Sequence, residues 1–434
     1  MFGTSGIRGP VGETVTADLA LRMGRALGVD ADRVVVGRDP RESGEFLLDA
    51  LAAGLRESGT DVIDLGLAAT PTVARAVRWE RADAGVMITA SHNPPQDNGI
   101  KLWQPSTQAY DTPRQETIAR RIDEGTTDLK NWEAIGSCER RNATKNHVQA
   151  ILEAVDVEDP PEVVLDLGNG AGGITVEALS ELGCDLETLN AQPDGSFPGR
   201  QSEPTAENCE ALAYLAGDSD AVGIAHDGDA DRMRAATEDG EFLSGDTLLA
   251  VLARAAAEPG DRIAAPLNSS LAVDDYLARD DIDVERTRVG DVSVAERASD
   301  PDVVFGGEPS GAWIWPDAAL CPDGPLAAAK LVELAAERPL RDRAAEVEQY
   351  PIYRDSVAVE AKATVMQRVR EQVRPTYDDV TELDGVRVAL DDGWFLIRAS
   401  GTQPLVRMTA EARDSDRALE IFEEATGIVT HAVE

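Results

Sequence analysis

The stretch PEVVLDLGNGAGGITVEALSELGCDLETLN, residues 161–190, has the pattern of one strand–helix–strand unit. A continuous apolar run leads into a glycine-rich turn, then into residues with helical spacing that end at Gly183, and then into a second short strand. Apolar strands that alternate with helices are typical of parallel sheets, because both faces of such sheets are covered. This stretch therefore predicts an α/β unit.

The same pattern occurs twice more along the chain. The first copy lies within residues 33–66 and contains RVVVGRD and GTDVIDLG as its strands. The last copy lies within residues 261–291 and contains DRIAAPLNSS and DVERTRVGD. Three such copies predict three related α/β domains with mostly parallel, mixed sheets.

The last part of the chain has a different pattern. YPIYRDSVAVEA, VRVAL, GWFLIRASG and VRMTAEA read as strands with partial alternation, and helices are expected at 364–373 and 415–426. This combination predicts a small α+β domain with an antiparallel sheet. The expected domains are 1–145, 146–245 and 246–345, all α/β, and 346–434, which is α+β.

Composition narrows the class of protein. The 434 residues are too many for one ordinary core, and they carry 80 acidic against 41 basic residues, with a formal charge of −39. No basic stripe is available for nucleic acid. No apolar run is long enough to span a membrane, and no signal pattern is present, so we expect a cytoplasmic protein.

Two further features of the composition indicate the environment. Lysine is nearly absent, and an acidic, lysine-poor surface is favoured in a salt-rich cytoplasm, where salt screens self-repulsion. We therefore expect a halophilic source. Four scattered cysteines without a CxxC pair fit free thiols in a reduced compartment.

Three aspartates alternate in HDGDADR, residues 226–232. Asp227, Asp229 and Asp231 would repel one another unless a cation is present, and oxygen ligands of this kind suit Mg²⁺ or Ca²⁺. An EF-hand would place Glu238 at position twelve, but Arg232 stands at position six, where that loop needs glycine. Two alternatives remain, a metal site and a solvated acidic turn.

The segment DLGNGAGG, residues 166–173, contains glycines with the spacing of a dinucleotide-binding loop at Gly168, Gly170 and Gly173. The following strand ends in Asn190 and lacks a clear terminal acid for a ribose. We favour a tight strand-to-helix turn over a dehydrogenase site.

Two later loops contain residues suited to binding, one to a phosphate and the other to a polyol. RASGTQPLVR, residues 398–407, places arginines beside small hydroxyl residues and bare backbone N–H groups, which suits a phosphate clamp. The alternative is a hairpin turn with ordinary surface arginines. GGEPSGAW, residues 306–313, could hydrogen-bond a polyol through Glu308 and Ser310. The alternative is an ordinary glycine-rich loop.

The segment TASHNPPQDNGIKLW, residues 89–103, places Ser91 at the end of an apolar strand. A serine-hydrolase nucleophile needs an elbow with flanking glycines, which this segment lacks, and His92 is too close in sequence to act as its base. A phosphorylated serine near the aspartates fits better, because Mg²⁺ would neutralise the phosphoryl oxygens. A turn or helix-cap serine is the alternative.

Together these motifs resemble the α-D-phosphohexomutase family over essentially the whole chain. FGTSGIRG (2–9) is similar to the family's N-terminal signature, and the segments above are similar to its serine, metal, sugar and phosphate loops in the family's order. The resemblance implies four domains around one central cleft, with one loop from each.

The resemblance also implies residue roles. Ser91 would be the phosphoserine and, with Asp227, Asp229 and Asp231, would bind Mg²⁺. Arg8 and Lys101 would assist proton transfer and stabilise charge beside it. Expected substrate contacts are Arg232, Arg288, Glu308, Ser310, Arg398, Ser400, Gly401, Thr402 and Arg407.

The implied reaction moves a phosphoryl group from Ser91 to a hexose monophosphate and back through a hexose 1,6-bisphosphate. SGTQP and Asp291 resemble the phosphoglucosamine branch, whereas Ala312 departs from the histidine found in much of the family. Glucosamine phosphate is the expected substrate, with mannose or glucose phosphates as the alternative and a non-catalytic phosphosugar-binding protein as a remote one. A monomer or homodimer is expected.

Overall fold

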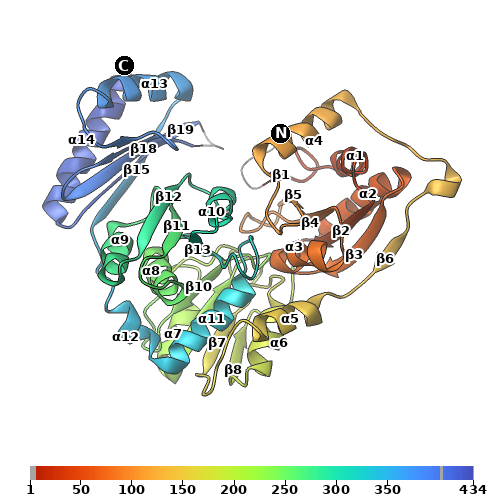
Figure 1. Cartoon of the computed structure of the whole chain (residues 1–434), viewed down its shortest axis with the longest axis horizontal. Coiled ribbons are helices and arrows are strands. Elements are labelled where there is room, and N and C mark those ends of the chain that lie inside the picture. Colours follow the sequence, from red (N-terminus) through yellow and green to blue (C-terminus); the bar gives the residue numbers. More distant parts are fainter. Residues whose placement is uncertain (1–5, 401–403, 434) are drawn as a thin grey trace.

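The structure is a computed structural model that describes residues 6–400 and 404–433. Four sheets follow one another along the chain, and the C-terminal one lies at the opposite end of the molecule from the first (Figure 1). The first three are mixed and covered by helices, and the fourth is antiparallel. This confirms the predicted α/β class with an added α+β domain.

The first sheet has the strand order β1-β5-β4-β2-β3-β6. Its part of the chain comprises β1 (Ile7–Pro10), α1 (Ala17–Leu27), β2 (Arg33–Arg38), α2 (Gly44–Glu57), β3 (Asp61–Leu67), α3 (Thr70–Trp79), β4 (Ala84–Ile88), β5 (Asp97–Trp103), α4 (Thr112–Glu124), η1 (Trp132–Ala134) and β6 (Cys138–Arg140).

The second and third sheets have four strands each. The second part comprises α5 (Thr144–Leu152), β7 (Val163–Asp166), α6 (Gly173–Glu181), β8 (Leu186–Leu189), α7 (Glu210–Ser219), β9 (Val222–His226) and β10 (Met233–Ala236). The third comprises α8 (Gly245–Ala256), β11 (Arg262–Pro266), α9 (Leu271–Leu277), η2 (Ala278–Asp280), β12 (Asp283–Thr287), α10 (Asp291–Ala298), β13 (Val303–Glu308), β14 (Ala312–Ile314), α11 (Gly324–Glu337) and α12 (Leu340–Ala344).

These three sheets share one strand order. In the first, the strands β5-β4-β2-β3 lie side by side, with β2, β3 and β4 parallel and β5 antiparallel. The orders β10-β9-β7-β8 and β14-β13-β11-β12 repeat it, again with one antiparallel edge strand. Numbered within each copy, the order is 4-3-1-2. The repeated sequence pattern therefore corresponds to a repeated topology.

The C-terminal sheet has the order β15-β19-β18-β17-β16. Its elements are β15 (Ile352–Ala358), α13 (Lys362–Val373), β16 (Val380–Thr381), β17 (Val386–Ala389), β18 (Gly393–Ala399), β19 (Leu405–Ala412) and α14 (Ser415–Val433). The helix predicted at 415–426 was too short. Ala418, Ile421, Ala425 and Val429 form one buried stripe that continues past Gly427, so packing outweighs the cost of that glycine.

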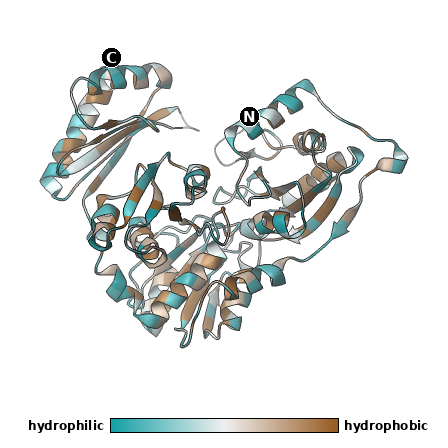
Figure 2. Cartoon of the chain, in the orientation of Figure 1, coloured by the Kyte–Doolittle hydropathy of each residue, from teal (hydrophilic) through white to brown (hydrophobic). Residues whose placement is uncertain are grey.

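The hydrophobic cores do not follow the sheets one to one. A single buried cluster joins the second and third parts, from Val148 to Val347, and also includes Ala69 of the first part. The C-terminal domain has a separate core between its sheet and the helices α13 and α14. In Figure 2 the hydrophobic colour is concentrated on the strands, and the outer helices carry much of the hydrophilic colour.

No helix in the described ranges is long and apolar enough to cross a membrane. The four cysteines are free thiols, as expected.

Candidate active site

The predicted loops occupy equivalent places in the fold. In each of the first three domains, the loop connects the third strand to the antiparallel fourth strand: 89–96 between β4 and β5, 227–232 between β9 and β10, and 309–311 between β13 and β14. The strand order reverses beside that third strand, and ligands of open α/β sheets bind at such points. The C-terminal loop connects β18 to β19.

Ser91 is buried and has a left-handed backbone with a φ of 52°. Its hydroxyl donates a hydrogen bond of 2.6 Å to an oxygen of Asp227, which lies 136 positions later in the chain. His92 Nδ1 is 3.4 Å from the same hydroxyl. Burial, with Arg232, Arg8 and Lys101 nearby, lowers the pKa of His92 to about 2, so this ring is too weak a base to activate Ser91.

Asp227, Asp229 and Asp231 each offer an oxygen, and these oxygens lie within 4.8 Å of one another. All three residues are buried, which excludes the solvated-turn alternative. Asp229 Oδ1 is buried without a hydrogen-bond partner in the structure. An unpartnered carboxylate oxygen beside two further carboxylates is suited to a hard divalent cation, so the triplet could hold Mg²⁺.

The acidic charges shift one another's protonation. Burial and the neighbouring Asp231 and Asp229 carboxylates raise the pKa of Asp227 well above its usual value. Burial would also raise the pKa of Asp229, but the ammonium group of Lys101 and a hydrogen bond from Thr70 hold it below the usual range. Burial and mutual repulsion therefore oppose the simultaneous ionisation of the three carboxylates, and a bound cation would relieve that repulsion.

Lys101 places its positive charge against two of the three aspartates. Its Nζ lies 3.0 Å from Asp229 Oδ2 and 2.6 Å from Asp231 Oδ2. Burial would lower the pKa of Lys101, but these two carboxylates raise it, so the side chain stays protonated. Arg8 lies on β1 opposite Gly99 of β5, and its buried Nε has no hydrogen-bond partner in the structure. Both predicted cations are close enough to Asp229 and His92 to shift the pKa values of these residues.

Arg232 connects the acidic loop to the third domain. Its backbone N–H donates to Asp227 Oδ1 at 3.2 Å, and its backbone forms a β-bridge with Ala312. Ser310 Oγ donates to Glu308 at 3.0 Å. Burial and the nearby Asp291 raise the pKa of Glu308. Because Ser91 of the first domain also contacts Asp227, loops of three domains meet at this acidic loop.

The remaining predicted residues lie toward the C-terminal domain. Arg398 on β18 is paired in register with Arg407 on β19, and its guanidinium lies 3.3 Å from Asp384. Asp384 also accepts the backbone N–H of Val289, next to the exposed Arg288. Ser400 is buried, and its carbonyl accepts from Lys362. Gly401 and Thr402 lie outside the described residues.

Several supporting residues were missed from sequence. Thr70 donates to Asp229, and Ser202 donates to the carbonyl of Ser91, each across a domain boundary. Lys362 at the start of α13 contacts the predicted phosphate loop. Of these supporting residues, Asp39 and Arg41 could have been found from the sequence, because they directly follow the predicted strand β2. The carboxyl end of β2 lies beside that of its parallel neighbour β4, which leads to Ser91.

Two sequence features prove to have structural roles. The Arg200 guanidinium lies where a Cβ on Gly168 would be, and Ala171 donates to Gly228 O in the acidic loop. The glycine-rich turn is therefore packed within the protein. Glu238 accepts the backbone N–H groups of Leu340 and Arg341, so it caps α12 and does not contribute to the triplet.

Three like α/β domains and a smaller α+β domain, with a serine facing an acidic triplet, define a phosphoryl-transfer enzyme of the phosphohexomutase class. The sequence matches all four domains of phosphoglucomutase/phosphomannomutase: alpha/beta/alpha domains I, II and III at residues 1–128, 145–240 and 244–350, and the C-terminal domain at 355–428. The chain belongs to the phosphoglucomutase/phosphomannomutase family.

Similar proteins are found among archaea. A relative named "Probable phosphoglucosamine mutase" from Methanopyrus kandleri is 46% identical over 446 residues, covering 100% of this chain and 98% of that protein. A relative of the same name from Methanosarcina acetivorans is 46% identical over 442 residues, covering 100% and 99%.

Solved structures agree with the fold. A phosphoglucomutase/phosphomannomutase family protein from Burkholderia thailandensis has a TM-score of 0.89 at 27% identity and covers 100% of this chain and 99% of its own. The N-acetylphosphoglucosamine mutase of Aspergillus fumigatus, solved with GlcNAc-6P and magnesium, has a TM-score of 0.62 at 15% identity, covering 100% and 96%. At that identity the likeness concerns the fold alone.

Proposed function

We propose that the protein interconverts glucosamine 6-phosphate and glucosamine 1-phosphate through a phosphorylated Ser91 and a glucosamine 1,6-bisphosphate. The observation that carries the proposal is the 2.6 Å hydrogen bond between Ser91 Oγ and Asp227. It places a serine oxygen from one domain against a buried acidic triplet from another, as a phosphoserine that needs a cation beside it would require.

Asp227, Asp229 and Asp231, with an oxygen of phosphorylated Ser91, would hold Mg²⁺, which when bound neutralises charge on the transferring phosphoryl group. Lys101 and Arg8 add positive charge from the first domain. These fixed charges stabilise the transition state without having to reorganise, because they are already held in place.

In the forward direction, the bond between phosphorus and Ser91 Oγ breaks, and a bond to a sugar hydroxyl oxygen forms. In the second transfer, the other phosphate of the bisphosphate returns to Ser91 Oγ. The proton lost by the first sugar hydroxyl is matched by the one regained at the second, so the cycle consumes nothing. We assign Glu308 and Ser310 to the sugar hydroxyls, with Arg232 beside them.

The other phosphate of the sugar requires a second binding site. We assign it to Arg398, Ser400, Gly401 and Thr402, with Arg288 and Arg407 nearby. Arg398 supports this assignment because Asp384 links it to the backbone of Val289, beside Arg288 of the third domain. Guanidinium groups suit this site, since they bind the phosphate of either isomer in the same way.

Relatives named phosphoglucosamine mutase at 40–46% identity favour glucosamine over other hexoses. The SGTQP motif and Asp291 also favour glucosamine phosphate as the substrate. Mannose or glucose phosphate is the second candidate, because the Burkholderia protein, at 27% identity, belongs to the wider family. We place the enzyme in the cytoplasm as a monomer or homodimer.

Activity assays with glucosamine, glucose and mannose phosphates in high salt, with the matching 1,6-bisphosphate present, test the substrate. We expect the highest kcat/KM for glucosamine phosphate. A higher value for mannose or glucose phosphate would move the enzyme to the second candidate.

Intact-mass measurement tests the mechanism and the remote alternative of a non-catalytic binding protein. We expect one phosphate that is lost in Ser91→Ala together with turnover, whereas Ser299→Ala, at an exposed serine, should keep both. A Ser91→Ala enzyme with wild-type turnover would refute the phosphoserine mechanism.

A further inference from the structure

Ser91 is held in a backbone conformation that a non-glycine residue rarely adopts. Its φ of 52° lies in the left-handed region, where the Cβ atom of such a residue comes too close to the backbone. A residue keeps a strained conformation only where contacts from its surroundings hold it there, and such residues cluster at functional sites. The contacts that hold both backbone groups of Ser91 therefore indicate what positions its hydroxyl.

The carbonyl of Ser91 is held by a buried arginine. Arg41 Nη2 donates to the carbonyl oxygens of Ser91 at 2.9 Å and Asn93 at 2.6 Å, and Nη1 donates to those of Pro94 at 2.6 Å and Asp97 at 2.9 Å. With Nε donating to Asp39, all five guanidinium N–H groups have acceptors. Arg41 is 1% exposed, so solvent cannot replace these bonds.

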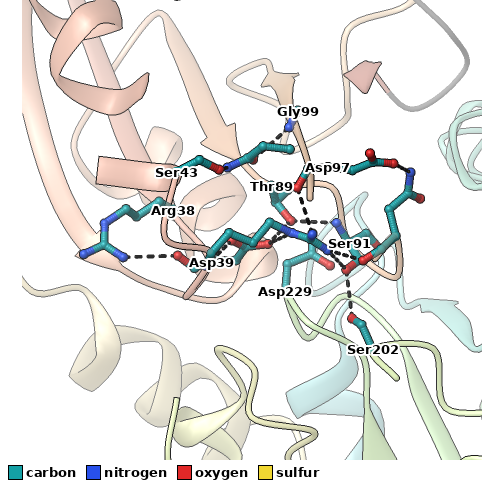
Figure 3. A network of polar contacts seen from close by, with 12 residues as sticks. Arg38, Asp39, Ser43, Thr89, Ser91, Asp97, Gly99, Ser202 and Asp229 are labelled. Atoms are coloured by element: carbon teal, nitrogen blue, oxygen red, sulfur yellow. Dashed lines mark hydrogen bonds and ion pairs between the residues drawn. The ribbon is translucent and has the colours of Figure 1, made fainter. Parts of the chain in front are cut away.

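A second chain of hydrogen bonds connects the Asp39 carboxylate to the backbone amide of Ser91. Ser91 N–H donates to Thr89 Oγ1 at 2.8 Å, and that hydroxyl donates to Asp39 Oδ2 at 2.7 Å. Figure 3 shows Asp39, Thr89 and Ser91 joined in this way, with Ser202 approaching from the other side. Asp39 is fully buried, so one carboxylate orients both the amide and the carbonyl of Ser91.

Residues of the second domain contact Ser91 and Arg41 from the other side. Ser202 Oγ donates to the Ser91 carbonyl at 2.9 Å, and the Phe197 ring lies 5.0 Å from the Arg41 guanidinium carbon. A Cβ at Gly195 would lie 2.5 Å from the Cα of Arg41, so this loop packs directly on the arginine. Arg41 is therefore fixed between the domain that carries Ser91 and the domain that carries the aspartates.

We propose that Arg41 and Thr89, both oriented by Asp39, are positioning residues that aim Ser91 Oγ at the acidic triplet for phosphoryl transfer. The inference rests on the proposed function. The buried network would hold the serine in its strained conformation while the phosphoryl group enters and leaves. Misplacement of a reacting group by about 1 Å can cost about 100-fold in rate.

The test compares Thr89→Val, Thr89→Ser and Arg41→Lys in the full-length protein. Valine has the shape of threonine but leaves the Ser91 amide without its acceptor, whereas serine keeps the hydroxyl. Lysine keeps the positive charge of Arg41 but lacks the planar guanidinium that donates to several acceptors at once. The matched control is Thr60→Val, because the Thr60 hydroxyl is also buried and donates to Ala31 O at 2.6 Å, away from Ser91.

Three quantities are measured: kcat and KM for the hexose phosphate, and the rate at which glucose 1,6-bisphosphate phosphorylates Ser91, followed by intact mass. For Thr89→Val and Arg41→Lys we expect kcat and the phosphorylation rate to fall about 10- to 100-fold, with KM unchanged within about two-fold. Thr89→Ser should stay within about three-fold of the wild type. Thr60→Val should lose thermal stability but keep kcat.

Wild-type kcat in Thr89→Val, or an equal loss of kcat in Thr60→Val, would overturn the positioning role even if Arg41→Lys did not fold. A wild-type protein without mutase activity on glucosamine, glucose or mannose phosphate, and without phosphate on Ser91, would instead refute the proposed function, and the inference with it.

Discussion

The carboxylate of Asp229 has two different environments. Oδ2 accepts hydrogen bonds from Thr70 and Lys101, whereas Oδ1 is buried without a hydrogen-bond partner among the described residues. Replacement by asparagine keeps an oxygen for Thr70 but removes the charge that a cation would need. Lys101 retains Asp231 as a partner at 2.6 Å, so its charge does not become isolated.

For Asp229→Asn we therefore expect kcat to fall about 100-fold or more, with only a small change in Tm. Steady-state kinetics over a range of Mg²⁺ concentrations, together with thermal unfolding, check this. Asp239→Asn, at an exposed position after β10, is the control and should keep its activity. Normal Mg²⁺-dependent turnover in Asp229→Asn would remove this residue from the metal site.

Arg398 should act on binding more than on the chemical step. A charge-assisted hydrogen bond is worth about 1.5–3 kcal/mol, and the phosphate clamp is made in both ground and transition states. Arg398→Ala should therefore raise KM about 10- to 100-fold and change kcat little, as initial-rate kinetics would show. Arg417→Ala, at a half-buried arginine of the same domain, serves as control. An unchanged KM would place the phosphate site elsewhere.

At the scale of single residues, the site residues could be predicted where several of them lie close together in one short motif. Asp227, Asp229 and Asp231 alternate within five positions, so their convergence could be predicted. Asp39 and Arg41 lie about fifty positions before Ser91, and only the pairing of β2 with β4 brings them to it. Their role depends on tertiary contacts that local spacing does not contain.

Three helices meet where the first three domains join. Asp323 caps α11, accepts from Arg75 of α3 at 2.7 Å, and lies 3.0 Å from Nε2 of His147 in α5. All three side chains are buried, so removing the carboxylate would leave the Arg75 charge without its acidic partner. This cluster therefore ties the domains together through elements distant in sequence.

For Asp323→Ala we expect a loss of about 3–5 kcal/mol in the free energy of unfolding, as found when one partner of a buried pair is removed. Urea unfolding measures it. Arg417→Ala, which breaks an exposed pair, should cost about 1 kcal/mol or less. A loss in Asp323→Ala no larger than that of the control would contradict the role of this cluster.

The same cluster should respond to pH. Burial lowers the pKa of His147 despite the opposing effect of Asp323, so the folded protein holds this ring neutral more firmly than the unfolded chain does. Its contribution to stability should be complete above the unfolded pKa of about 6.5 and decline as the pH falls below it. Unfolding of wild type and His147→Gln between pH 8 and 5 tests this; identical pH dependence would contradict it.

At the scale of elements, the apolar strands and their crossover helices were predictable because their periodicity is local. The antiparallel edge strands were harder: β14 has only three residues, and β10 has four. They are defined by pairing with β13 and β9, and not by a pattern of their own. The extra length of α14 likewise comes from its packing against the C-terminal sheet.

The whole molecule carries a large excess of negative charge, −39 over 434 residues. Such self-repulsion destabilises a compact state, and it is screened over about 3 Å at 1 M salt compared with about 10 Å at 0.1 M. We therefore expect Tm to rise between 0.1 M and 2 M KCl. Calorimetry in KCl and in sucrose would separate the screening of charge from the stabilisation by any solute that is excluded from the protein surface. An unchanged or lower Tm in KCl would contradict the halophilic hypothesis.

The common strand order of the first three domains has an evolutionary consequence. Sheets with the same 4-3-1-2 arrangement are what two successive gene duplications of one ancestral unit would leave. Under the proposed function, the same connection would carry the phosphoserine in the first copy, the metal-binding aspartates in the second and the residues that bind sugar hydroxyls in the third. Because the sugar-binding residues would then lie in a separate copy, substrate preference could change between lineages without any change in the residues proposed to transfer the phosphoryl group.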